Sequence, residues 1–225
     1  MWNSTDSRWR AMNQDAQQYI NKVIPLRWSD DTSLFTHVCS TGARSIHAAV
    51  CFNTSGSISV NGVNFPNVSG SLGSAFISTN IDISGSGFSA YTGPRNGSEK
   101  TDTVSRLFDR FLFNGTNLDI QLKNLNTGSF YCINFFTMLF DNSVRTGYLL
   151  DTSFGNTYPA PALYLFDSRM CVPTPTPSPF TDVPSPIYSY IFEARADAQR
   201  FRLQNVNGLH HYGILVYRLD ESLVP

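Results

Sequence analysis

The stretch Phe130-Tyr-Cys-Ile-Asn-Phe-Phe-Thr-Met-Leu-Phe140 is the longest nearly unbroken apolar run in the chain. Its apolar residues fall on both odd and even positions, so a strand formed here buries both of its faces. A helix fits the composition poorly, because the run is aromatic and β-branched and lies between turn signals at 126–129 and 141–143. The run therefore predicts a central strand, and the rest of the chain has to supply a covering layer on each side.

Length and composition allow a substantial core, in one large domain or two small ones. The chain has 225 residues, of which 41% are hydrophobic and 13% aromatic. Only 15% are charged, the net charge is −1, and Lys and Arg do not cluster. Direct binding to nucleic acid or to an anionic membrane surface is therefore not expected. We also expect no membrane span and no signal peptide, because no long apolar run is present and the N-terminus is polar.

From residue 33 onward the apolar residues recur with a period of two, which is the spacing of half-buried strands. Asn61-Gly62, between Ser57–Val60 and Val63–Phe65, is a strong signal for a two-residue hairpin turn. The alternating stretch Leu118–Leu122 leads through a turn into the central strand, so we expect these two strands to pair as a hairpin. About ten to twelve strand candidates with short turns between them predict an all-β sandwich of two sheets, with jelly-roll connectivity.

Two stretches depart from this period and have helical spacing. Asp6 can cap a helix that continues to about Ile24 and ends at Pro25. Its apolar seam either covers the domain's own core or docks on a neighbouring subunit, which makes it the candidate interface. A second, short helix is expected from Asp102 to the stop signal at 114–115. The residues of the N-terminal seam are Trp9, Met12, Ala16, Tyr19 and Val23.

Six prolines between 172 and 186 predict a stiff, extended surface loop, because alternating prolines cannot form a strand ladder. The loop is not a domain boundary, since the residues after it hold too few strands for a separate core. We therefore expect a helical arm at residues 1–28 and a single β-sandwich domain at 29–225.

His37-x-Cys39 and His47-x3-Cys51 form the best candidate for a metal site. Each pair has an even spacing, which places its members on one face of a strand. Zinc, however, needs four converging ligands, and residues four apart on a straight strand are about 13 Å apart. We therefore expect buried thiols and hydrogen-bonded histidines here, and no metal site.

Residues that could catalyse a reaction are also sparse. The remaining histidines, His210-His211, offer no nucleophile with a base and an orienting group, and the chain has no Gly-x-Ser-x-Gly elbow. The glycines at 70, 73, 85 and 87 lie among strand signals, which does not support a phosphate-binding loop. We predict that the protein is not an enzyme, has no catalytic residues and needs no cofactor.

In architecture the chain resembles the single jelly-roll structural subunits of viral capsids. The resemblance rests on the arm before residue 30, the strands and long loops that follow, one helix in a crossover, and the low charge. It implies a structural subunit of vertex, cement or spike type, located in the virion and assembled with copies of itself or with other structural subunits. Because a basic genome-binding arm is missing, the resemblance does not extend to packaging of nucleic acid.

A carbohydrate- or receptor-binding β-sandwich, that is, a lectin-like head, is the alternative. Exposed aromatic side chains near Asn or Asp in loops would serve a glycan ligand. Tyr91 with Arg95-Asn96, and Tyr158 near Asn156, are the positions of this kind. A monomer that binds glycans would favour this alternative, and a chain that assembles would favour the virion subunit.

We predict that all four cysteines, Cys39, Cys51, Cys132 and Cys171, are free thiols. They are widely spaced, no secretion signal is seen, and a chain of this length does not need disulfides for stability. Thiol titration of the unfolded protein without reductant should find four free thiols per chain. Two or fewer thiols, or zinc bound in stoichiometric amount, would contradict this prediction.

Overall fold

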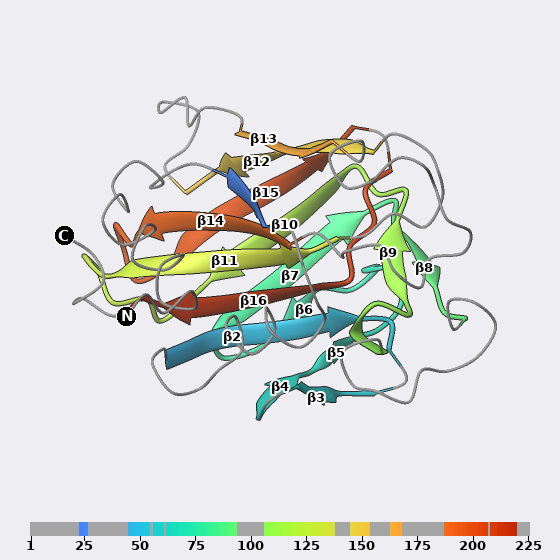
Figure 1. Ribbon diagram of the computed structural model, residues 1–225, viewed down its shortest axis with the longest axis horizontal. Coiled ribbons are helices and arrows are strands. Elements are labelled where there is room, and N and C mark those ends of the chain that lie inside the picture. Colours follow the sequence, from blue (N-terminus) through green and yellow to red (C-terminus); the bar gives the residue numbers. More distant parts are fainter. Residues whose placement is uncertain are drawn as a thin grey trace, which may run out of the picture.

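The computed structural model describes most of the chain and shows a sandwich of two mainly antiparallel sheets (Figure 1). The all-β prediction is therefore confirmed. None of the helices among the described residues is long and apolar enough to cross a membrane. The described residues are 23–26, 45–54, 56–60, 62–93, 106–137, 145–153, 163–167, 187–206 and 208–219.

The first sheet, which we call the β11 sheet, has the strand order β1-β14-β11-β16-β2-β5. Its strands are β1 (Val23–Leu26), β14 (Ile187–Glu193), β11 (Phe130–Phe136), β16 (Gly213–Arg218), β2 (Ser45–Phe52) and β5 (Asn67–Val68). All of its pairs are antiparallel except β2 with β5, which is parallel and involves two residues of each strand.

The second sheet, which we call the β10 sheet, has the order β13-β12-β15-β10-β7-β6. Its strands are β13 (Leu163–Asp167), β12 (Thr146–Asp151), β15 (Gln199–Asn205), β10 (Asn117–Leu122), β7 (Ile81–Ser86) and β6 (Phe76–Ile77). Two small hairpins complete the fold, one of β3 (Ile58–Val60) with β4 (Val63–Phe65) and one of β8 (Ser89–Tyr91) with β9 (Phe111–Phe113).

The strand order is that of a jelly roll. Strand β2 pairs with β16, β10 with β15, β11 with β14, and β12 with β13, so that the first strand of the series pairs with the last and the pairs are nested inward. Successive pairs fall in alternate sheets, which is what folding one long antiparallel ribbon over itself produces. The expected jelly-roll connectivity is confirmed.

Strand β11 lies between β14 and β16 and is buried on both faces, as predicted. Tyr131, Ile133 and Phe135 point into the inner core between the two sheets. Cys132 and Phe136 point the other way, into an outer core. Because both edges and both faces of β11 are occupied, its backbone and side chains are withdrawn from water along most of its length.

The outer core is covered by the β3–β4 hairpin and by the chain just before β9. Phe65 of the hairpin lies edge-on to Phe136 with ring centroids 6.1 Å apart. Phe108 also lies edge-on to Phe136, with ring centroids 6.0 Å apart. The hairpin forms at the predicted turn, where Gly62 has a φ of 80°. A positive φ at this position is the reason that glycine suits the turn.

The predicted hairpin between Leu118–Leu122 and the central strand is wrong. Strand β10 belongs to the second sheet and β11 to the first, so the connection at 123–129 crosses from one sheet to the other. A tight turn does form near its end, where Ser129 N donates to Asn126 O. Local alternation could not show this crossing, because both edges of β11 are taken by strands that come much later in the chain.

The predicted N-terminal helix, which was expected to continue to about Ile24, is wrong in its last two residues. Val23–Leu26 form strand β1, which pairs with β14 at the edge of the β11 sheet. Pro25 is tolerated there, because an edge strand can direct the position without an N–H toward solvent. Of the predicted interface residues, Val23 is therefore in a strand, and the others (Trp9, Met12, Ala16 and Tyr19) lie outside the described residues. Their role as an interface stays a prediction.

The second predicted helix is also largely wrong. Only residues 106–107 of its described part are helical, and Phe111–Phe113 form strand β9. Strand β9 pairs with β8. In addition, Leu112 N donates to His211 O at 3.0 Å, and His211 N donates to Leu112 O at 2.9 Å. These long-range backbone bonds outweigh the helical spacing of the apolar residues. The proline-rich loop at 172–186 lies outside the described residues.

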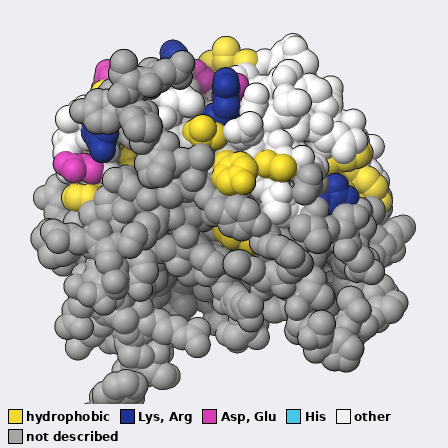
Figure 2. Space-filling view, turned by 90° about the horizontal axis from the view of Figure 1, so that it is seen from above, with side chains coloured by type: hydrophobic (Ala, Val, Ile, Leu, Met, Phe, Trp, Pro, Cys, Tyr) yellow, Lys and Arg dark blue, Asp and Glu magenta, His cyan; other side chains and the backbone are white. Residues whose placement is uncertain are grey.

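The face near β12 and β13 is seen in Figure 2, which views the molecule from above relative to Figure 1. The basic, acidic and hydrophobic side chains of the described residues are interspersed on this face and are not gathered by type. This distribution agrees with the low net charge of the chain.

Phe135→Ala is expected to lower the free energy of unfolding by about 3–5 kcal/mol, because it removes a buried aromatic ring and leaves a cavity in the inner core. Phe136→Ala should have a similar effect from the outer core. The measurement is denaturant unfolding, with Phe113→Ala as a control that should cost less, because Phe113 of strand β9 is only half-buried. Losses below about 1 kcal/mol for both core variants would contradict the assignment of β11 as a doubly buried strand.

Candidate functional site

Strand β2 contains a β-bulge that decides where its side chains point. The register with β16 skips His47, which has no partner residue on that strand. A bulge reverses the alternation of side chains along a strand. His47 consequently lies edge-on to Tyr131 of the inner core at a ring distance of 5.2 Å, whereas Cys51 belongs to the outer core. The expectation that even spacing places His47 and Cys51 on one face is wrong.

Cys51 and Cys132 are free and buried, as predicted. The thiol of Cys51 lies 3.2 Å from Thr54 Oγ1 and donates to Phe65 O at 3.3 Å. Burial raises the pKa of the Cys51 thiol, which favours the neutral and unreactive form. The other two cysteines, Cys39 and Cys171, lie outside the described residues, as does His37. The predicted state of those cysteines therefore stays a prediction.

His210 and His211 are buried among aromatic rings next to β9. His210 lies 4.4 Å from the ring of Phe111, and His211 lies edge-on to Phe88 at 5.7 Å. Burial, with a smaller contribution from His210, lowers the pKa of His211 to about 3. At neutral pH His211 is therefore uncharged, and it packs as part of the core.

A groove of about 520 Å³ runs beside β2, between the β3–β4 hairpin and the turn that joins β6 to β7. It is lined by residues 46–49 of β2, by 62–64 and 66 around β4, and by 78–81 of the turn. Its volume falls within the range of about 300–1,000 Å³ that is usual for ligand pockets. This groove is the candidate site.

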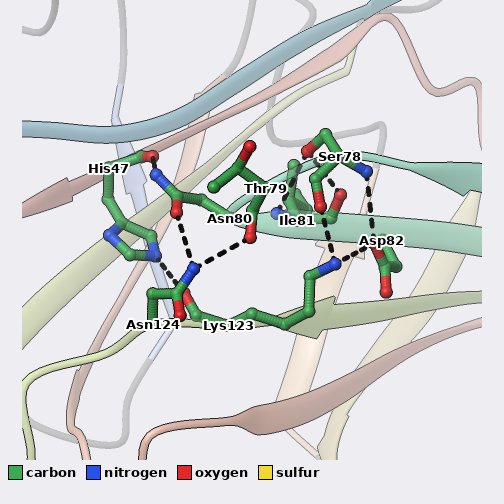
Figure 3. A network of polar contacts seen from close by, with 8 residues as sticks. All are labelled: His47, Ser78, Thr79, Asn80, Ile81, Asp82, Lys123 and Asn124. Atoms are coloured by element: carbon green, nitrogen blue, oxygen red, sulfur yellow. Dashed lines mark hydrogen bonds and ion pairs between the residues drawn. The ribbon is translucent and has the colours of Figure 1, made fainter.

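The wall formed by the turn is held in place by hydrogen bonds to β2 and to the end of β10 (Figure 3). Asn80 Nδ2 donates to His47 O at 2.7 Å, and His47 Nε2 lies 2.9 Å from Lys123 O. Asn124 Nδ2 donates to Thr79 O at 3.1 Å and lies 3.3 Å from Asn80 Oδ1. The turn is therefore tied to both sheets, and its amide groups are positioned before any ligand arrives.

An ion pair closes the far end of this network. Lys123 Nζ donates to Asp82 Oδ1 and to Ser78 O, each at 2.6 Å (Figure 3). Each side chain is 26% exposed, so the pair is partly screened by water and its two charges cancel locally. Its main effect is to pin the turn to β10.

The described lining of the groove carries no fixed charge at neutral pH. The described residues that line it include no carboxylate, thiol, ammonium or guanidinium group. Burial lowers the pKa of His47, opposed by its bond to the Lys123 carbonyl, so the ring is neutral at pH 7. The lining combines apolar side chains with amides and hydroxyls. This arrangement offers apolar contact and hydrogen bonds to an uncharged ligand.

Of the binding positions predicted from the sequence, only Tyr91 lies among the described residues, and it does not line the groove. Tyr91 is the last residue of strand β8 and stacks on Phe111 with ring centroids 4.9 Å apart. It is partly buried and packs against the outer core. Its predicted companions Arg95-Asn96 lie outside the described residues, and so do Tyr158 and Asn156. The groove was not predicted, because its lining comes from three segments separated in sequence. The Asn-Gly hairpin and Pro66 were the only local signals near it.

Comparison with known proteins bears on the fold. No protein-family model and no curated protein matches the sequence. The ANX2 ectodomain from Arabidopsis thaliana matches with a TM-score of 0.50 at 10% identity, over 80% of this chain and 51% of that one. The ANXUR1 extracellular domain from the same plant has a TM-score of 0.49 at 10% identity, over 80% and 50%. The plant peptide RALF23 in complex with FER and LLG2 gives 0.49 at 13% identity, over 87% and 55%.

The chain thus spans about half the length of each of these structures. The likeness to the ANX2 ectodomain overturns the sequence-based assignment to a capsid subunit located in a virion. That assignment rested on architecture alone, and a similar architecture is found in an ectodomain from a plant.

Acid should destabilise the protein through His211. Its pKa is 6.5 in the unfolded chain and about 3 in the folded one, so the unfolded chain binds the proton more strongly. The stabilisation is complete above about pH 6.5 and decreases as the pH falls toward 3. Between pH 7.5 and pH 5 the free energy of unfolding should fall by about 2 kcal/mol more in the native protein than in His211→Phe.

Denaturant melts of the two proteins at the two pH values measure this difference. The comparison with the variant is needed because the pKa of His47 is lowered as well and acts in the same direction. Equal pH dependence in both proteins would show that His211 is not held neutral by the fold.

Proposed function

We propose that the chain is a non-catalytic recognition module that binds an uncharged ligand in the groove beside β2. The observation that carries this proposal is the neutral lining of the groove, where amides and hydroxyls stand beside apolar side chains on a hydrogen-bonded wall. This is the composition expected of a pocket that selects its ligand by shape and by a few placed polar groups.

Preorganisation of the turn supports binding over a structural role for the same residues. Asn80 and Asn124 are held by bonds to backbone carbonyls, so the ordering of the turn is complete in the free protein. A ligand that meets an ordered wall loses less free energy to ordering than one that meets a flexible loop. The exposed Asn64 stands on the opposite wall, where its amide is available to a ligand.

The charge of the groove narrows the class of ligand. A phosphate, a carboxylate or an ammonium group would lose its hydration without meeting an opposite charge in the described lining. A neutral glycan or an uncharged stretch of polypeptide has the hydrogen-bonding groups that the amides and hydroxyls can match.

The proposal includes an extracellular setting and a ligand carried by another molecule. The support for the setting is the fold, which the chain shares with the ANX2 ectodomain. The setting does not follow from the groove, and it is proposed together with the function because an ectodomain has a similar fold.

Blocking the groove should abolish ligand binding. Asn64→Arg places a long side chain on an exposed position of the groove wall, where it fills the space that the ligand needs. The full chain is screened on a microarray of neutral oligosaccharides and against a display library of random decapeptides. The selected ligands should bind Asn64→Arg at least tenfold more weakly than the native chain, as measured by calorimetry.

The matched control is Ser59→Arg. Ser59 is exposed, lies directly opposite Asn64 in the same hairpin, and does not line the groove. It adds the same charge to the same hairpin, so it should bind the selected ligands as the native chain does. Equal binding by Asn64→Arg and the native chain would exclude the groove as the binding site.

A further inference from the structure

The edge of β2 that faces the groove is unpaired at Ala49. Phe52 N donates to Tyr212 O on the β16 side, and Cys51 N donates to Pro66 O on the opposite side, each at 3.0 Å. Backbone groups alternate in direction along a strand, and the register from Ala48 to Cys51 is unbroken. Ala49 therefore directs its N–H and C=O to the same side as Cys51, into the groove. No described residue bonds the Ala49 backbone there.

Pro66 is the reason that the chain's own pairing stops before Ala49. The parallel ladder with β5 continues through Asn53 N, which donates to Val68 O at 3.0 Å, so each step moves two residues along both strands. One step in the other direction would bring the N–H of residue 66 to Ala49 O. Proline has no N–H, and the chain turns away from β2 at this point into the hairpin that covers the outer core.

We propose that an extended segment of a partner protein adds to β2 at this edge as a further strand. Its backbone donates to Ala49 O and accepts from Ala49 N–H, and it thereby continues the ladder that β5 begins at Cys51. This inference rests on the proposed function and assigns its ligand to the polypeptide class. The groove gives such a segment access, because Ala49 and its neighbours Ile46 and His47 are only half-buried.

The two walls of the groove define the side chains of the added segment. Successive side chains of a strand point to opposite faces. One set would face Val63 and the outer core, and the other would face the hydroxyls and amides of Ser78 and Asn80. The bound segment should therefore alternate apolar residues with uncharged polar ones. A charged residue is disfavoured on either side, since no described residue of the lining can pair with it.

Removing the Ala49 N–H is the direct test. Ala49→Pro deletes the donor that faces the groove and leaves the bonds to β16 in place, because those are made by the neighbouring residues. Peptides are selected from a display library of random decapeptides against the full chain and then synthesised. They should alternate as described, and they should bind Ala49→Pro at least tenfold more weakly than they bind Ala49→Ser, which keeps the N–H.

Amide exchange of the native chain gives a second readout that does not depend on folding of the variant. Hydrogen exchange at Ala49 N–H, followed by NMR, should be fast in the free chain and slowed at least tenfold by a selected peptide. Unchanged exchange at Ala49, or equal affinity of the folded Ala49→Pro and Ala49→Ser variants, would overturn strand addition. A different result would contradict the proposed function: selected ligands that bind Asn64→Arg as tightly as they bind the native chain.

Discussion

Burial of β11 on both faces is the constraint on which the rest of the structure depends. Ile133 and Phe135 require a second sheet on one side, and Cys132 and Phe136 require a cover on the other. The jelly-roll pairing supplies the first layer, because it places β10 and its neighbours opposite the β11 sheet. The second layer has to come from connections, since both sheets are already used. The β3–β4 hairpin and the residues before β9 fill this role.

The groove is a consequence of that second layer. The chain between β2 and β7 has to leave the edge of the β11 sheet in order to lay the hairpin over the outer core, and it rejoins β2 only at Cys51 and Phe52. Among the described residues, the part of β2 before Cys51 therefore has no strand partner on that side. Exposed strand edges are usually protected in soluble proteins. Here the Asn80 side chain bonds the His47 carbonyl, which protects one position and leaves Ala49 open.

The function of this fold is decided by its sites, and the overall architecture did not identify it. A single jelly roll is compatible with a shell subunit and with a binding domain, because the same nested pairing buries the same kind of core in both. What separates these roles is the surface. Uncharged walls, a fixed turn and unpaired backbone groups in one groove describe a place where a ligand can bind.

The sequence by itself determined the features that arise from near neighbours. Alternating apolar and polar residues predicted the strands. Apolar residues at both odd and even positions predicted the buried β11, and Asn61-Gly62 predicted the β3–β4 hairpin. The tertiary structure alone decided that 111–113 form a strand, that β10 and β11 lie in different sheets, and that a bulge turns His47 away from Cys51. The candidate groove belongs to this second group. Its walls, and the free groups of Ala49, depend on which strands lie beside β2, and such pairing between distant segments leaves no periodic pattern in the chain.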